Sequence, residues 1–237
     1  MRLSAPIFVL KRKARLLARQ EGIALHAALD RIAVAEGSAG WSLLAARLSA
    51  SSPAARLRDH LAPGDLLLLG AKPGHGKTLL GLEVAVEAMR SGSRAIFFSL
   101  DYTASDILAR FRDIEAEPAR YDALFTFDGS DDISADYIML VLSTAARGTV
   151  VVIDYLQLLD QKRTNPEVGQ QVAALRTFAR ARGLILIFLS QIDRAFDPSG
   201  KRVPDVSDVR LPNRMDLALF DKTCFLNEGE IRLGRAA

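Results

Sequence analysis

Apolar residues follow two different rhythms along this chain. From residue 63 onward, short unbroken apolar runs alternate with longer segments whose apolar positions recur at helical spacing. The runs predict β-strands, and the longer segments predict α-helices. Strands are expected at 65–70, 94–100, 124–127, 149–153 and 184–189, with late strands at 217–220 and 223–226. Helices are expected at 77–90, 104–113, 133–146 and 166–182, with a short helix opened by Pro118. This alternation predicts an α/β fold with a mainly parallel central sheet and helices on both faces.

The first 50 residues carry only the helical rhythm. Helices are expected at 10–20, 23–36 and 41–49, and the stretch rich in serine that follows is typical of a linker. The chain is therefore expected to consist of a helical segment at 1–50, a linker at 51–62 and an α/β domain at 63–237. The three short helices suit a plain helical cap, but also a mini-domain, a helix-turn-helix or an oligomerisation arm.

Charge changes this picture, because the N-terminal segment is basic. The whole chain has a net charge of only +3, but residues 1–60 hold ten Lys or Arg against four Asp or Glu. Six basic residues precede the first acidic one, Glu21; they are Arg2, Lys11, Arg12, Lys13, Arg15 and Arg19. Such an arm suits nucleic acid or an acidic protein partner. A solvated helix face explains the same charges equally well.

Cysteine usage and hydropathy indicate a compartment. Cys224 is the single cysteine, which excludes an internal disulfide framework and is typical of a reducing environment. No apolar run approaches the ~20 residues of a membrane span. We therefore expect a cytoplasmic protein that does not enter a membrane.

The most informative motif lies between the strand at 65–70 and the helix at 77–90. Ala71-x-x-x-x-Gly76-Lys77-Thr78 fits the phosphate-binding P-loop pattern, with Ala where the first Gly often lies. Backbone N–H groups of such a turn surround phosphate oxygens, and the dipole of the following helix adds to the attraction. Lys77 is expected to reach the β- and γ-phosphates, and Thr78 to offer its hydroxyl to Mg²⁺. The expected nucleotide-binding residues are Ala71, Lys72, Pro73, Gly74, His75, Gly76, Lys77, Thr78 and Leu79. The alternative is a Gly-rich turn that binds nothing.

Three polar residues that follow other predicted strands complete the candidate site. Asp154 ends the run at 149–153, where a carboxylate can hold the Mg²⁺ shell, or can simply cap a turn. Asp101 ends the strand at 94–100 and can orient or deprotonate the attacking water, or can serve as the N-cap of the next helix. Gln191 follows the strand at 184–189, where a neutral amide can sense the γ-phosphate, unless it is only a turn residue.

Five segments carry a resemblance to a known family. They lie at 61–78, 97–103, 151–159, 189–194 and 204–210, and the most specific string is Asp154-Tyr155-Leu156-Gln157-Leu158-Leu159. In this order they resemble the C-terminal RecA-type motor domain of bacterial replicative helicases of the DnaB type. The resemblance covers roughly residues 58–221, and residues 1–50 do not resemble the large N-terminal domain of that family.

The resemblance implies a RecA-like P-loop ATPase that uses ATP and Mg²⁺. It assigns phosphate and metal binding to Lys77 and Thr78, water-mediated Mg²⁺ binding to Asp154 and the sensor role to Gln191. It also implies a homo-oligomer of the hexameric-ring kind, with ATP between subunits and single-stranded DNA in a central channel. Loops at 160–165 and 194–205 would contact that DNA. Their basic residues suit a phosphate backbone: Lys162, Arg163, Arg194, Lys201 and Arg202. Solvated loops are the alternative.

Two departures from the family pattern bear on activity. The family has Ser-Leu-Glu where this chain has Ser99-Leu100-Asp101, so the expected catalytic base is one methylene shorter. Misplacement by about 1 Å can cost ~10²-fold in rate. The family also continues with a segment whose arginine reaches the γ-phosphate of the neighbouring subunit, a contact worth about 10³–10⁵ in rate in other P-loop enzymes. Only Arg232 and Arg235 stand near that place.

Three functions agree with these observations. The first is an ATP-hydrolysing, helicase-type motor domain that acts on single-stranded DNA. The second is a nucleotide-dependent regulatory or binding module with little hydrolysis, which the two departures favour, and whose residues 1–50 contact a protein partner. The third is a RecA- or KaiC-like ATPase in repair or signalling.

Overall fold

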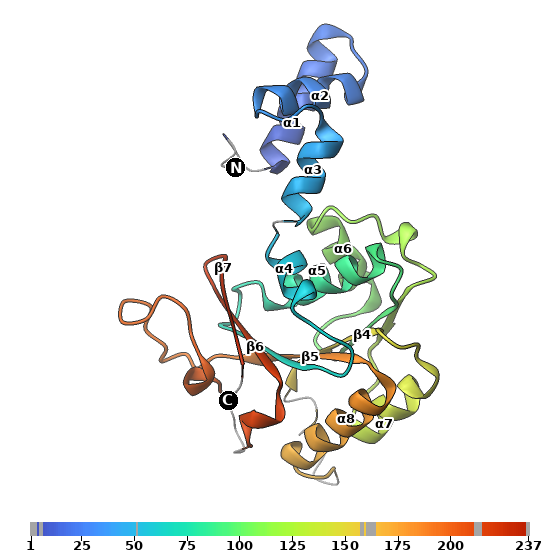
Figure 1. Cartoon of the computed structure of the whole chain (residues 1–237), viewed down its shortest axis with the longest axis vertical. Coiled ribbons are helices and arrows are strands. Elements are labelled where there is room, and N and C mark those ends of the chain that lie inside the picture. The colour runs from blue at the N-terminus through green and yellow to red at the C-terminus, as the bar shows by residue number, and fades with distance from the viewer. Residues whose placement is uncertain are drawn as a thin grey trace. The chain divides into compact units, whose positions relative to one another are not determined.

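The chain divides into two compact units, Met1–Arg56 and Leu57–Ala237 (Figure 1). The structure, a computed structural model, describes residues 4, 7–50, 52–156, 159, 165–210 and 215–235. Within these ranges no helix combines the length and the apolar character needed to cross a membrane.

The N-terminal unit consists of helices, as its periodicity predicted. They are α1 (Ile7–Glu21), α2 (Leu25–Ala35) and α3 (Trp41–Ala50). Helix α2 packs against both α1 and α3. The buried residues of these helices are small or aliphatic: Leu10, Ala14, Ala28, Ala33 and Leu44. The basic side chains of α1 remain exposed to solvent at Arg12, Lys13, Arg15 and Arg19.

The expected linker at 51–62 contains a helix, which corrects that prediction. Helix α4 (Pro53–Asp59) occupies its centre, and the boundary between the two units falls within it. Ser52 stabilises the start of α4, because its hydroxyl accepts a hydrogen bond from the N–H of Ala55 at 3.0 Å. Pro53 suits the first helical position, since its fixed φ is already helical. A Ser-Pro pair that signals a helix start was thus mistaken for a linker.

A seven-stranded sheet forms the centre of the C-terminal unit, in the order β3-β2-β4-β5-β1-β6-β7. The strands are β1 (Leu66–Ala71), β2 (Ala95–Ser99), β3 (Phe125–Asp128), β4 (Val150–Asp154), β5 (Ile185–Gln191), β6 (Lys222–Asn227) and β7 (Glu230–Gly234). All neighbouring pairs are parallel except β6 and β7. Strands β1 and β4 are buried along their whole length, as expected for parallel strands covered on both faces.

Helices cover both faces of this sheet, so the α/β prediction is confirmed (Figure 1). On one face lie α5 (Lys77–Arg90) and α6 (Ala104–Asp113); on the other lie α7 (Ala135–Val141) and α8 (Val168–Arg182). The face under α7 and α8 is packed by aliphatic residues such as Leu68, Ile153 and Leu186, together with Phe188. Helices α5 and α6 begin and end where the sequence predicted.

Several predicted boundaries near the other helices were wrong. Helix α7 begins at Ala135 rather than at 133, because the Ser134 hydroxyl accepts the Tyr137 N–H and caps it, and the chain tightens into a 3-10 turn at Leu142–Thr144. Helix α8 begins at Val168 rather than at Pro166. The carbonyl of Pro166 accepts a hydrogen bond from the Gln171 side chain instead of a helical N–H.

The C-terminal strands were also predicted incompletely. The expected strand at 217–220 is a 3-10 turn, Leu217–Leu219, and the Asp216 carboxylate caps it by accepting the N–H of Ala218. The strand at 223–226 is confirmed as β6. Strand β7 was missed, since its alternating exposed and half-buried residues carry no apolar run.

Candidate nucleotide site

The Gly-rich turn lies where a buried strand meets a helix, as a phosphate-binding turn requires. Strand β1 ends at Ala71, and α5 begins at Lys77. Gly74 and Gly76 have φ angles of 80° and 86°, a left-handed conformation that residues with a Cβ rarely adopt. The turn therefore places the first backbone N–H groups of α5 at the carboxyl edge of the sheet, where an anion is favoured.

Asp154, the last residue of β4, is the centre of the site. Its carboxylate accepts hydrogen bonds from the Thr78 hydroxyl at 2.8 Å and from Lys77 Nζ at 3.3 Å. The side chain is fully buried. Burial raises the pKa of Asp154, whereas the Lys77 ammonium and the Thr78 hydroxyl oppose that rise. Asp154 is thus a buried carboxylate joined to the P-loop, and not the cap of a turn.

The side chains of Lys77, Thr78 and Asp154 fit a nucleoside triphosphate bound together with Mg²⁺. In P-loop proteins Mg²⁺ is held by the P-loop hydroxyl, a strand-end Asp and phosphate oxygens. Mg²⁺ usually takes few protein ligands and keeps several waters. The described residues contain no group of three or more His, Cys, Asp or Glu that could hold a metal by itself.

Asp101 lies close to Asp154, one strand away. It follows β2, which pairs with β4 so that Ser99 stands opposite Asp154. The Asp101 side chain is exposed, and its backbone N–H donates to Ser99 Oγ at 3.1 Å. Burial is the largest cause that raises the pKa of Tyr155, and the negative charge of Asp101 is the next largest. Asp101 therefore faces the same edge as Asp154.

Helix α6 has a different N-cap, so that alternative for Asp101 is wrong. The Thr103 hydroxyl accepts the N–H of Asp106, and the Asp106 carboxylate accepts the N–H of Thr103. This reciprocal capping box satisfies the start of α6. Asp101 is left outside the helix.

Gln191 is the last residue of β5 and stands beside the first residue of the P-loop. It pairs in register with Ala71, and its carbonyl accepts the N–H of Arg210 at 2.9 Å. It is therefore a strand residue and not part of a turn. The strand order β2-β4-β5-β1 brings Asp101, Asp154, Gln191 and the P-loop to one edge of the sheet, where open α/β sheets bind ligands.

The basic residues expected to contact DNA have mixed surroundings. Lys162 and Arg163 lie outside the described residues. Arg194 is exposed and, together with Asp193 and Arg210, lines a cavity of about 350 Å³.

Lys201 and Arg202 both form ion pairs. Lys201 Nζ lies 2.5 Å from Asp205 and 2.7 Å from Asp208, and Arg202 pairs with Glu230. Phe196, the aromatic residue of this loop, is only 7% exposed. It is therefore not an open stacking platform.

The two C-terminal arginines lie at the other end of the sheet. Arg232 is an exposed residue of β7, the edge strand beyond β6, and stands opposite Phe225. Arg235 follows the same strand and is also exposed. In the strand order, β7 lies away from β2, which Asp101 follows, and from β4, which ends in Asp154.

Two features near the P-loop were not predicted. Gly70 packs so closely that an added Cβ would lie 2.7 Å from the Phe225 ring and 3.0 Å from Ile192. Lys72 Nζ donates to the carbonyl oxygen of Phe196 at 2.5 Å. Both contacts join residues far apart in sequence, and no local motif signals them.

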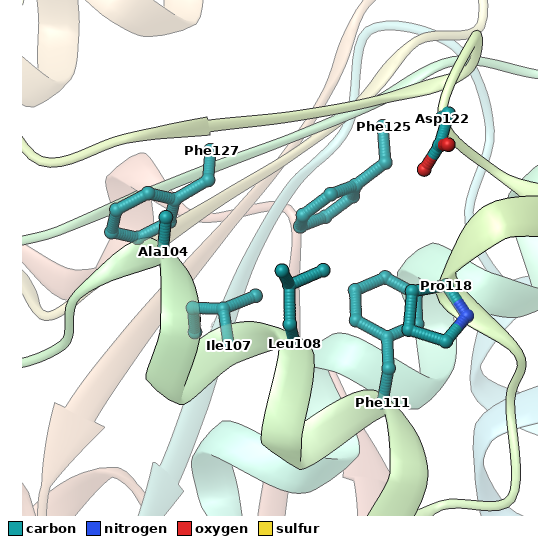
Figure 2. A pocket seen from close by; sticks show the side chains of 8 residues that line it. All are labelled: Ala104, Ile107, Leu108, Phe111, Pro118, Asp122, Phe125 and Phe127. Atoms are coloured by element: carbon teal, nitrogen blue, oxygen red, sulfur yellow. The ribbon is translucent and has the colours of Figure 1, made fainter.

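A second cavity lies beside the outermost strand β3, between it and α6 (Figure 2). It has a volume of about 280 Å³, and its lining is apolar except for Asp122. Phe111 meets Phe125 edge-on there, with 4.8 Å between ring centroids. Strands β2, β4 and β5 separate β3 from β1 in the sheet, so this cavity is distinct from the P-loop.

Comparison with solved structures identifies the fold class. The "ATPase Domain of G40P" superposes with a TM-score of 0.54 at 22% identity, covering 71% of each chain. The KaiC-like protein PH0186 from Pyrococcus horikoshii OT3 superposes with a TM-score of 0.52 at 19% identity, covering 74% of this chain and 80% of the other. Fold and site together define a P-loop protein with the RecA-like fold.

Sequence comparison identifies the family that this domain resembles. The family model described as "DnaB-like helicase C terminal domain" matches residues 126–216. The replicative DNA helicase DnaB of Leifsonia xyli subsp. xyli is 28% identical in an alignment of 185 residues that covers 65% of this chain and 40% of the helicase. A probable plasmid replicative DNA helicase of Chlamydia trachomatis is 28% identical in an alignment of 202 residues that covers 72% of this chain and 44% of the relative. The resemblance to the C-terminal ATPase domain of DnaB-like helicases is therefore confirmed, and the chain spans well under half the length of these relatives.

Proposed function

We propose that this chain is an ATP-hydrolysing motor domain of the DnaB helicase type that acts on single-stranded DNA as a homo-oligomer. The observation that carries this proposal is the contact of Asp154 with both Thr78 and Lys77. This contact joins the P-loop to the end of β4, so that the phosphate-binding turn and the strand-end carboxylate lie together, as nucleotide-dependent motors require. The similarity to replicative helicases supports the choice of DNA as the partner.

Each residue of the site has a role in this proposal. Lys77 binds the β- and γ-phosphates, and the other P-loop residues supply N–H groups. Thr78 and Asp154 would hold Mg²⁺, which would supply charge neutralisation for the transferred phosphoryl group. Asp101 orients and deprotonates the attacking water, and Gln191 senses the γ-phosphate. Lys77 exchanges its Asp154 contact for phosphate when nucleotide binds.

Contacts with DNA are assigned to the loop that follows β5. Arg194 is exposed there, and a guanidinium suits a phosphate backbone. Lys201 and Arg202 are engaged in ion pairs, so DNA binding through them requires those pairs to open. Assembly into a ring would bring each nucleotide site against a neighbouring subunit, where Arg232 and Arg235 are the arginines nearest in sequence to the place of the family's γ-phosphate arginine.

A second candidate is a nucleotide-dependent regulatory module with little turnover. The exposed Asp101, with its short side chain, favours this function, as do the ion pairs of Lys201 and Arg202. In that case ATP sets conformation or assembly, and the basic helix α1 contacts an acidic partner.

Hydrolysis measured with and without single-stranded DNA separates the two candidates. We expect single-stranded DNA to raise the rate of ATP hydrolysis by the wild type. Lys77→Ala should abolish ATP hydrolysis, and Asp101→Glu should hydrolyse ATP faster than the wild type. Sizing the protein with and without ATP tests the oligomer. If the wild type and Asp101→Glu are both inactive at every protein concentration, the motor function is wrong. If both turn over but DNA has no effect, the DNA-acting part is wrong.

A further inference from the structure

The two lysines of the P-loop have different partners. Lys77 contacts Asp154, within the nucleotide site. Lys72 instead reaches the loop beyond β5, where its Nζ donates to the Phe196 carbonyl at 2.5 Å and lies 5.2 Å from the centroid of the Phe196 ring. Its charge also helps to lower the pKa of Asp197, after the hydrogen bonds from Ser199. Lys72 thus bonds to a part of the chain more than a hundred residues away.

The loop that Lys72 contacts is a closed unit, which we name the 192–210 segment. Its two ends are bonded to each other, since Ile192 bridges Val209 and the Asp193 N–H donates to the Asp208 carbonyl at 2.8 Å. Lys201 ties its middle to Asp208. Because its two ends are held at the end of β5, the contact of Lys72 with Phe196 adds a further point at which the segment is held.

An apolar cluster packs around the residue that Lys72 contacts. Phe196 is buried together with Ile192 and Phe225. Phe225 and Ile192 also approach Gly70, at the base of the P-loop, so closely that a Cβ would collide with them. The turn that is expected to bind phosphate and the 192–210 segment therefore share both an apolar contact and the Lys72 hydrogen bond.

We propose that Lys72 is a positioning residue that couples nucleotide binding in the P-loop to the order of the 192–210 segment. This inference rests on the proposed function, because it assumes that the P-loop binds nucleotide. Bound phosphate would accept hydrogen bonds from the N–H groups of the turn and so restrict its motion. Once the turn is fixed, the stem of Lys72 is fixed with it and holds Phe196 in place. Coupling of this kind is reciprocal, so a ligand that orders the segment strengthens nucleotide binding by the same factor.

Limited trypsin digestion of the full chain measures the order of this segment directly. Trypsin can cut after Arg194, Lys201 and Arg202, and mass spectrometry identifies each product. Pro73 follows Lys72, and trypsin does not cut before proline, so changing Lys72 removes no cleavage site. Lys72→Met keeps the length of the stem and loses the ammonium, whereas Lys72→Arg keeps the charge and the donors.

Two comparisons decide the matter. Without nucleotide, we expect Lys72→Met to be cut in the segment at least fivefold faster than the wild type and Lys72→Arg to be cut at close to the wild-type rate. With a non-hydrolysable ATP analogue and Mg²⁺, each variant is saturated according to its own binding curve. Nucleotide should then slow cleavage of the wild type and of Lys72→Arg by about fivefold or more, and should have little effect on Lys72→Met.

The outcomes distinguish this inference from the proposed function. We call the contact of Lys72 with Phe196 the tether. Equal cleavage rates of the wild type and Lys72→Met without nucleotide would show that the tether does not order the segment. Equal protection of the two by bound nucleotide would overturn the coupling, as would a failure of Lys72→Arg to restore it. A wild type that binds no nucleotide at all would refute the proposed function and the coupling, while the nucleotide-free comparison would still decide on the tether.

Discussion

Gly70→Ala tests how tightly the base of the P-loop packs. The new Cβ would lie 2.7 Å and 2.8 Å from two atoms of the Phe225 ring and 3.0 Å from Ile192 Cδ1. Phe225 and Ile192 are buried, so they cannot turn away into solvent. Overpacking of this kind costs about 1–3 kcal/mol. Alanine is favoured over glycine in a strand by about 0.5–1 kcal/mol, so the free energy of unfolding should fall by about 1 kcal/mol at the middle of these ranges and by about 2.5 kcal/mol at most.

Gly81→Ala is the matched control. Its Cβ would lie 3.3 Å from Leu189 and from Val152, which is a tight contact. The cost of that contact opposes the gain of up to about 1 kcal/mol that alanine has over glycine in a helix. We therefore expect a change near zero.

Urea unfolding followed by far-ultraviolet circular dichroism measures both variants. The single tryptophan, Trp41, lies in the N-terminal unit and would not report on this site. Adding Phe225→Leu to Gly70→Ala should recover part of the loss, since the two changes share a contact. A Gly70→Ala protein as stable as the wild type would refute the close packing on which the cluster beneath Lys72 depends.

Three further predictions concern single side chains. Burial raises the pKa of Asp154 above the ordinary value of 3.8, so the folded protein holds that proton more tightly than the unfolded chain does, and nucleotide-free stability falls as the pH rises above 3.8. Asp154→Asn should remove this fall in urea midpoints measured across pH while abolishing Mg²⁺-dependent ATP binding; an unchanged pH profile would contradict it. Thr103→Ala should cost about 1 kcal/mol in urea unfolding through loss of the α6 cap, with ATP binding as in the wild type. Cys224 is buried, and burial raises its pKa to about 12, so its thiol should react with Ellman's reagent only as fast as the protein unfolds.

Features with a local cause were predicted well from the sequence. Helices α5 and α6 have the predicted bounds, because glycine, threonine and charged residues mark their ends within a few positions. The placement of Asp101, Asp154 and Gln191 at one edge of the sheet could be predicted because the ends of parallel strands meet there.

Features that depend on distant contacts were not found. Strand β7 exists because it pairs with β6, and its own residues form no apolar run. The Lys72 contact with Phe196 depends on how the loop after β5 folds back. Local sequence carries no signal for either. The 3-10 turn at Leu217–Leu219 was mistaken for a strand, because three residues are too few to reveal their period.

The most direct test of the candidate nucleotide site is equilibrium binding of ATP to the wild type and to Thr78→Val, each with Mg²⁺ and with EDTA. Valine keeps the volume of threonine and removes the hydroxyl that contacts Asp154 at 2.8 Å. Hydrogen bonds to charged groups contribute about 1.5–3 kcal/mol, and about 1.4 kcal/mol corresponds to a tenfold change in affinity. We predict that EDTA weakens ATP binding to the wild type by about tenfold or more, and that Thr78→Val binds ATP in the presence of Mg²⁺ about tenfold or more weakly than the wild type does. Mg²⁺ should not strengthen ATP binding to the variant. Identical binding curves for the two proteins, with and without Mg²⁺, would contradict a Mg²⁺–nucleotide site built from Thr78 and Asp154.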